Sequence, residues 1–130
     1  MSQLQQATVS DSKANQAAIS TATSGTWHAV CALDDIWPNT GVCALVESRQ
    51  VAIFRLQDDQ LYAIDNYDPH SDANVISRGI VGDLGGERVV ASPIYKHHYQ
   101  LSTGICVEDA DIRLQTYPVE LRDAAVWVQV

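Results

Sequence analysis

From Trp27 to its end, the chain is a series of short runs rich in β-branched and aromatic residues, separated by turn residues. Pro and Gly recur often enough to prevent long helices, and this punctuation is typical of all-β proteins. We therefore predict an all-β fold, with strands over residues 27–31, 42–46, 50–56, 61–65, 79–84, 88–91, 99–101, 115–121 and 125–130.

Two turns and two strand patterns narrow the architecture. Asp58-Asp59-Gln60 separates two alternating runs, and Gly85-Gly86 supplies the positive φ angles that tight hairpins need. Residues 51–56 are nearly all apolar, which predicts burial on both faces, whereas residues 126–130 alternate valine with other residues and predict one buried face. Both patterns suit a small barrel or sandwich. One helical turn is expected over residues 32–36 and a short helix over 71–77.

Length and composition indicate one domain preceded by a tail. The first 24 residues are rich in Gln, Ser, Ala and Thr and contain no aromatic residue, so we predict a flexible N-terminal tail over 1–24 and a folded domain over 25–130. The net charge of −8 argues against nucleic-acid binding. The chain has neither an apolar run of about 18 residues nor a secretory signal, which predicts a cytoplasmic protein that is not inserted in a membrane.

The cysteines and tryptophans are predicted to be structural. Cys31, Cys43 and Cys106 are odd in number, widely spaced and set among apolar neighbours, so we expect small buried side chains rather than disulfides or zinc ligands. The three tryptophans are expected to pack in the core or seal strand ends. They are Trp27, Trp37 and Trp127.

Two proline-containing loops resemble the ligand loops of a Rieske domain. A Rieske [2Fe–2S] centre takes two thiolates and two imidazoles from a C-x-H loop and a C-x-x-H loop. In this chain the loops read Asp68-Pro69-His70 and Ser92-Pro93-Ile94-Tyr95. Asp68 and Ser92 stand at the cysteine positions and Tyr95 at the second histidine position, so only His70 is retained.

Other segments support the resemblance and make it more specific. Residues 99–104, Tyr-Gln-Leu-Ser-Thr-Gly, resemble the F-D-x-x-T-G that closes the second ligand loop in Rieske domains. Together with the segments 27–35, 77–83 and 92–96, they make the chain similar to the small subunit of cytoplasmic NADH-dependent nitrite reductase, over about residues 27–130. That family has a Rieske-like fold without the cluster ligands.

The resemblance implies both a fold and a role. The fold would be a Rieske-like small β-barrel or sandwich with a hairpin subdomain that carries the two former ligand loops. The chain would be a non-catalytic accessory subunit with no cofactor of its own. Its partner would be a large subunit bearing FAD, a [4Fe–4S] cluster and sirohaem, in an enzyme that reduces nitrite to ammonium with NADH for nitrite assimilation or detoxification.

In Rieske domains the two ligand loops converge at one tip, where redox partners dock. If the tip persists in this chain, it carries a polar, partly aromatic and partly basic patch on an otherwise acidic protein. Tyr and Arg are enriched at binding hot spots, and imidazoles could make affinity depend on pH. We therefore predict a partner interface made of His70, Arg78, Tyr95, Lys96, His97 and His98, and no catalytic residue.

Two alternatives remain open from the sequence. One is a metal-binding oxidoreductase with its own centre built from His70, Asp68 and the pair His97-His98, since histidine and carboxylate suit iron or zinc. Adjacent histidines on an extended segment point in opposite directions, which weighs against a shared ion. The other alternative is a stand-alone protein-interaction module with no enzyme partner.

Overall fold

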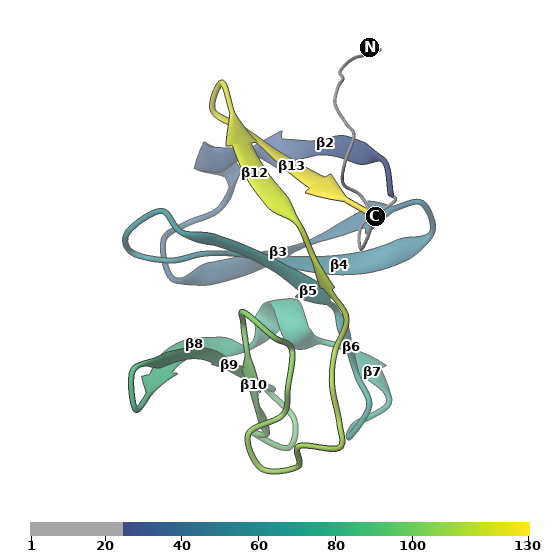
Figure 1. Ribbon diagram of the computed structural model, residues 1–130, viewed down its shortest axis with the longest axis vertical. Helices are drawn as coiled ribbons and strands as arrows, with labels where there is room; N and C mark the ends of the chain where they lie inside the picture. The colour runs from purple at the N-terminus through teal and green to yellow at the C-terminus, as the bar shows by residue number, and fades with distance from the viewer. Residues whose placement is uncertain (1–24) are drawn as a thin grey trace.

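The computed structural model describes residues 25–130, and the tail predicted over 1–24 lies outside this range. The described chain forms two β-rich lobes stacked along the long axis of the molecule (Figure 1). None of its helices is long and apolar enough to span a membrane. The elements are β2 (Trp27–Ala32), η2 (Leu33–Asp35), β3 (Thr40–Val46), β4 (Arg49–Arg55), β5 (Leu61–Asp65), β6 (Tyr67–Asp68), β7 (Ala73–Asn74), η3 (Ile76–Arg78), β8 (Ile80–Leu84), β9 (Glu87–Ala91), β10 (His98–Gln100), β11 (Thr116–Tyr117), β12 (Val119–Arg122) and β13 (Ala125–Gln129).

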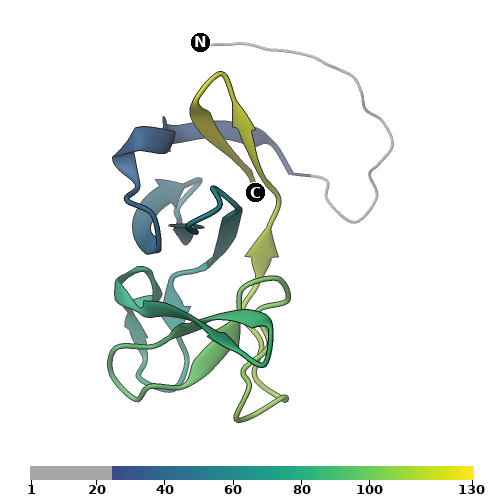
Figure 2. The ribbon, with the colours of Figure 1, turned by 90° about the vertical axis from the view of Figure 1, so that its left-hand side faces the viewer.

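The strands form four antiparallel sheets, none of which closes on itself within residues 25–130. One lobe contains the sheets β11-β5-β4-β3 and β12-β13-β2. The other contains β10-β9-β8 and the two-stranded sheet β6-β7, and it is the hairpin subdomain expected from the sequence (Figures 1 and 2). Both predicted hairpins are confirmed, since β4 pairs with β5 and β8 pairs with β9. Gly85 and Gly86 have φ angles of 61° and 91°.

Strand β4 connects the two hydrophobic cores. Val51 and Ile53 pack into the core of the first lobe, whereas Ala52 and Phe54 pack into the core of the hairpin subdomain. All four side chains are fully buried, which confirms the prediction of burial on both faces. Because successive residues of a strand point to opposite sides, one strand can serve both cores.

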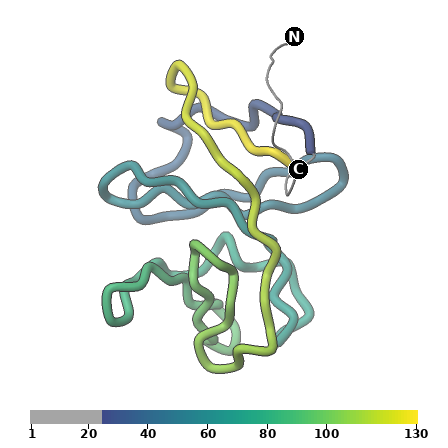
Figure 3. The backbone as a smooth tube through the Cα atoms, in the orientation of Figure 1, coloured from purple at the N-terminus to yellow at the C-terminus, as the bar shows by residue number. Residues whose placement is uncertain are grey.

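The predicted strand over residues 115–121 is two strands, not one. β11 pairs with β5, whereas β12 pairs with β13 in a different sheet. Pro118 separates them, and proline has no backbone N–H to continue a ladder. This break lets the chain return from the hairpin subdomain to the first lobe, along the yellow-green stretch of the tube in Figure 3.

The helix predicted over 71–77 is wrong, whereas the turn predicted at 32–36 is present as η2. The 71–77 segment instead contains β7, which pairs with β6, and the start of η3. Asp72 has a φ of 54°, which a right-handed helix does not accommodate. Asn66 also binds the segment, because its carbonyl and side-chain oxygens accept hydrogen bonds from the backbone of Ile76 and Ser77.

Three expectations about large or sulfur-containing side chains need correction. Trp37 is 78% exposed, in the loop between η2 and β3. Trp27 and Trp127 are half-buried, and each ring centroid lies 4.8 Å from the guanidinium carbon of Arg122 in a cation–π contact. Cys106 is buried as expected, but Cys43 is exposed, because it lies on the edge strand β3 and on the face opposite to the core of the first lobe.

Candidate functional site

Asp68 is the centre of the tip formed by the two former ligand loops. It ends β6 and is fully buried. Its Oδ2 accepts hydrogen bonds from the hydroxyls of Ser71 at 2.8 Å and Ser92 at 2.5 Å. Its Oδ1 accepts from the Tyr99 hydroxyl at 2.8 Å and from the backbone N–H of His70 at 3.1 Å. One carboxylate therefore ties both loops to β10.

The second loop closes on itself around Ser92. The Ser92 N–H donates to the carbonyl of His97 at 2.8 Å, and the Lys96 N–H donates to the carbonyl of Ser92 at 3.1 Å. Lys96 has a φ of 61°, which turns the chain back toward β10. The Ser92 hydroxyl faces inward to Asp68, so residues at the two former cysteine positions bind each other directly.

This network fixes the protonation states of its members. Burial raises the pKa of Asp68, but hydrogen bonds from Ser92, Tyr99, Ser71 and His70 outweigh it and hold the pKa below its usual range. Burial and the Asp68 carboxylate raise the pKa of Tyr99 far above its usual value, so its hydroxyl stays protonated. Tyr99 donates its only proton to Asp68. His70 Nδ1, 2.7 Å from the Tyr99 oxygen, must therefore be the donor in that contact.

Two imidazoles stack where the loops meet. The rings of His70 and His97 lie with centroids 3.6 Å apart and planes at 6°. His97 Nδ1 is buried without a hydrogen-bond partner among residues 25–130. His98 points elsewhere, since its Nδ1 lies 2.6 Å from Oε2 of Glu108. The adjacent residues His97 and His98 therefore contact different side chains, His70 and Glu108.

The structure brings only part of the predicted interface into direct contact. His70 and His97 touch, whereas His98 is hydrogen-bonded to Glu108. Tyr95, which is 61% exposed, and Lys96 project from the outer side of the second loop. Arg78 is exposed at the end of η3.

Sequence reasoning missed Tyr99 and Ser71 as partners of Asp68. The available signal was the hydroxyl of Tyr99 at the phenylalanine position of the F-D-x-x-T-G pattern. A buried tyrosine usually needs a hydrogen-bond acceptor, and the carboxylate at position 68 could have been proposed for it.

The side chains at the tip do not match the ligand set of a Rieske cluster. That cluster needs two thiolates and two imidazoles, and the positions hold a carboxylate, a hydroxyl, one imidazole and an outward-facing phenol. The Asp68 oxygens are already occupied by four donors. Within residues 25–130, no group of three or more His, Cys, Asp or Glu side chains is arranged to hold a metal ion.

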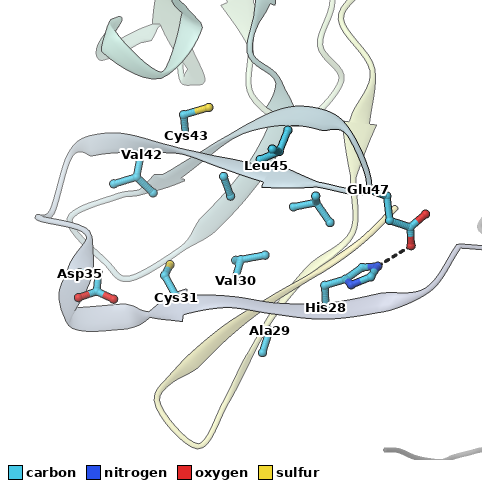
Figure 4. Close-up of a pocket in the computed structure, with 11 residues that line it drawn as sticks. His28, Ala29, Val30, Cys31, Asp35, Val42, Cys43, Leu45 and Glu47 are labelled. Atoms are coloured by element: carbon cyan, nitrogen blue, oxygen red, sulfur yellow. Dashed lines mark hydrogen bonds and ion pairs between the residues drawn. The ribbon is translucent and has the colours of Figure 1, made fainter. Parts of the chain in front are cut away.

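Away from the tip, a groove lies between the edge strands β2 and β3 (Figure 4). This groove of about 400 Å³ has Cys31 and Val30 on one wall and a 2.6 Å hydrogen bond between His28 and Glu47 at one end. Burial and the nearby Asp35 raise the pKa of Cys31, and burial raises that of Cys43. Both thiols are therefore protonated at neutral pH and poor nucleophiles.

A family model described as a Rieske-like [2Fe-2S] domain matches residues 26–129. Together with the fold, this match defines the class: the chain is a Rieske-like domain. The nitrite reductase (NADH) small subunit of Salmonella typhimurium is 46% identical over 101 residues, which cover 77% of this chain and 94% of that protein. The chain therefore belongs to the family of nitrite reductase small subunits, which are components of an oxidoreductase.

Two further comparisons agree with this assignment. The solution structure of the nitrite reductase [NAD(P)H] small subunit from Erwinia carotovora superimposes with a TM-score of 0.69 at 44% identity, covering 80% of this chain and 81% of that chain. The nitrite reductase [NAD(P)H] large subunit of Klebsiella oxytoca contains a matching segment, 43% identical over 102 residues, that covers 78% of this chain and 11% of that protein. The expected Rieske-like fold is confirmed.

Proposed function

We propose that this chain is a non-catalytic accessory subunit of NADH-dependent nitrite reductase. It docks on the large subunit and supports the assembly or electron transfer of an enzyme that reduces nitrite to ammonium. The observation that supports the proposal is the tip, where Asp68, at a cysteine position of the Rieske pattern, is held by hydrogen bonds in a chain 46% identical to a nitrite reductase small subunit. We assign the complex to the cytoplasm and to nitrite assimilation or detoxification.

The absence of a redox centre in this chain is part of the proposal. Asp68 and Ser92 are bound to each other, and His70 Nδ1 is bound to Tyr99. These contacts keep the loops together without a metal and use the atoms that a metal would need. The alternative of a metal centre at His70 gains no support from the geometry, because His98 points to Glu108 and Asp68 has four donors.

The large subunit is the partner that the comparisons favour, and we expect it to carry FAD, [4Fe–4S] and sirohaem. In the Klebsiella oxytoca protein, a segment related to this chain lies within the large subunit itself. A domain that occurs fused in one relative can act in another as a separate subunit bound to the same body. This relation also weighs against a stand-alone interaction module.

We propose that the docking surface lies at the tip. Tyr95 and Lys96 are exposed on the second loop, Arg78 is exposed at the end of η3, and His70, His97 and His98 border them. The Asp68 network keeps both loops in one arrangement before any partner binds. A preformed surface loses less conformational entropy on binding than a mobile one.

We expect this chain, purified without an affinity tag, to contain only trace iron and to lack visible absorption. The measurement is metal analysis together with an absorption spectrum and an acid-labile sulfide assay. A Rieske centre would give stoichiometric iron and sulfide with charge-transfer bands, and that result would contradict the cluster-free proposal while leaving the family assignment intact.

We expect the large subunit to oxidise NADH with nitrite faster, or to be recovered in greater yield, when it is co-produced with this chain. The measurement compares nitrite-dependent NADH oxidation and co-purification with and without the chain. A double variant, Tyr95→Ala with Lys96→Ala, is expected to lose most of the association while staying folded. Trp37→Ala, which removes an exposed aromatic side chain from the other lobe, is the matched control. Equal activity and no complex would defeat the proposal.

A further inference from the structure

Strand register places four residues in one row across the hairpin subdomain. Ile80 of β8 is paired with Ala91 of β9, and Ala91 is paired with His98 of β10. On the other side of β10, the segment 105–107 pairs with it through an antiparallel bridge between Tyr99 and Cys106. The Val107 N–H donates to the carbonyl of His98 at 2.7 Å, so Val107 lies opposite His98. Directly paired residues present their side chains on the same face of a sheet. We call the four residues the outer row: Ile80, Ala91, His98 and Val107.

The outer row faces away from the core. The next row, Val81, Val90, Tyr99 and Cys106, packs into the core of the hairpin subdomain, so the outer row must point to the opposite face. Ile80 is 69% exposed and Val107 is 46% exposed. β8 is also an edge strand with a free outer edge. The two outer members of the row, Ile80 and Val107, are thus exposed apolar side chains, with the half-buried Ala91 and the Glu108-bound His98 between them. Exposed apolar side chains beside the tip are the kind of surface that an interaction partner covers.

Two cations border the outer row. β8 and β10 both run antiparallel to β9, so they enter the sheet from the same end. Arg78 comes two residues before Ile80 and Lys96 two residues before His98, so both cations lie beyond the same end of the sheet, on one side of the row. Ile94 and Tyr95, also exposed, belong to the loop between β9 and β10 at that end.

These cations differ from the others in the described chain. Seven of the eight Lys and Arg residues lie within residues 25–130, and five of them bind acceptors of the protein itself. Those five are Arg49, Arg55, Arg88, Arg113 and Arg122. Among residues 25–130, Arg78 and Lys96 have no side-chain hydrogen bond or ion pair. In a protein of net charge −8, two cations that make no such contact within the described range, and that lie on one side of the outer row, indicate a complementary acidic surface on a partner.

We infer that the docking surface extends from the tip along the outer row, and that it binds an apolar patch of the large subunit bordered by carboxylates. Ile80 and Val107 supply the apolar contact, and Arg78 and Lys96 pair with the partner's acidic side chains. This inference rests on the proposed function and deepens it by naming the chemistry of the partner's surface.

The test measures the affinity of the purified large subunit for three variants of the full chain by biolayer interferometry. The double variant Ile80→Ser with Val107→Ser is expected to weaken binding by at least about tenfold. The double variant Arg78→Gln with Lys96→Gln is expected to weaken binding at about 50 mM NaCl and to flatten the salt dependence that the wild-type chain shows up to about 500 mM, since screening removes such pairs. Leu45→Ser, at a 74% exposed site on β3, is the matched control and should bind as the wild type does.

A second measurement, amide hydrogen exchange of the wild-type chain with and without the large subunit, does not depend on whether the variants fold. Binding is expected to protect the amides of residues 80–82 and 105–107, with β3 unchanged. A wild-type complex that tolerates both double variants, or that leaves these amides unprotected, would overturn the outer-row inference alone. Failure of the wild-type chain to form any complex would overturn the proposed function and this inference together.

Discussion

Replacing Asp68 by alanine is expected to lower the free energy of unfolding by about 3–5 kcal/mol. The substitution removes the acceptor of four hydrogen bonds and leaves the buried hydroxyl of Ser92 without its partner. It also removes the hydrogen bond between the first loop and Ser92 of the second loop, and the hydrogen bond from Tyr99 to the first loop. Urea unfolding of the full chain, followed by tryptophan fluorescence and circular dichroism, measures the change.

Asp72→Asn is the control for this variant, because Asp72 lies in the same loop, is exposed, and accepts a hydrogen bond from the exposed Tyr67, and because asparagine tolerates its φ of 54° as aspartate does. A surface change of this kind is expected to cost less than about 0.5 kcal/mol. Equal stabilities for the Asp68 and Asp72 variants would show that the buried network does not hold the tip together.

The Asp68 effect should depend on pH in one direction. Its pKa is lower in the folded protein than in the unfolded chain, so the carboxylate stabilises the fold at neutral pH. That contribution is lost as pH falls from about 4 through the lower pKa of the folded state. The gap in stability between the wild type and Asp68→Ala should therefore narrow in acid, and a gap that widens would contradict the assignment of an ionised Asp68.

Replacing Gly104 by alanine is expected to lower the free energy of unfolding by about 2–4 kcal/mol. Gly104 has a φ of 79°, and a Cβ added there would lie 2.0 Å from the carbonyl oxygen of Leu114. The same residue donates its N–H to Gln100 at 2.7 Å and accepts from Leu114 at 2.8 Å, so the backbone cannot move away without breaking these bonds. Urea unfolding is again the measurement.

Gly82→Ala is the matched control for Gly104→Ala. Gly82 has no positive φ, and a Cβ added there meets nothing within 4 Å. Alanine in this strand is expected to leave stability unchanged or raise it by up to about 1 kcal/mol, because it restricts the unfolded chain. Similar losses for both glycines would mean that glycine content in general, and not the close approach of Leu114, sets the stability of this segment.

Local sequence patterns predicted the structure correctly where the conformation of a segment depends on that segment alone. The apolar run of β4 predicted burial on both faces, and Gly85-Gly86 predicted a hairpin, because strand periodicity and positive φ depend on neighbouring residues alone. The same approach failed at residues 71–77 and 115–121. In the first, distant Asn66 binds the backbone, and in the second, two strands join different sheets on either side of Pro118.

The sequence by itself determined most of the strands, the Rieske-like resemblance and the loss of three of the four ligand positions, since these follow from residue identity and spacing. Only the tertiary structure decided what replaces the cluster and which face is open to a partner. Asp68 binds residues 24 and 31 positions away, and the outer row joins four segments of the chain. Such contacts depend on strand register and loop closure, which a local pattern does not specify.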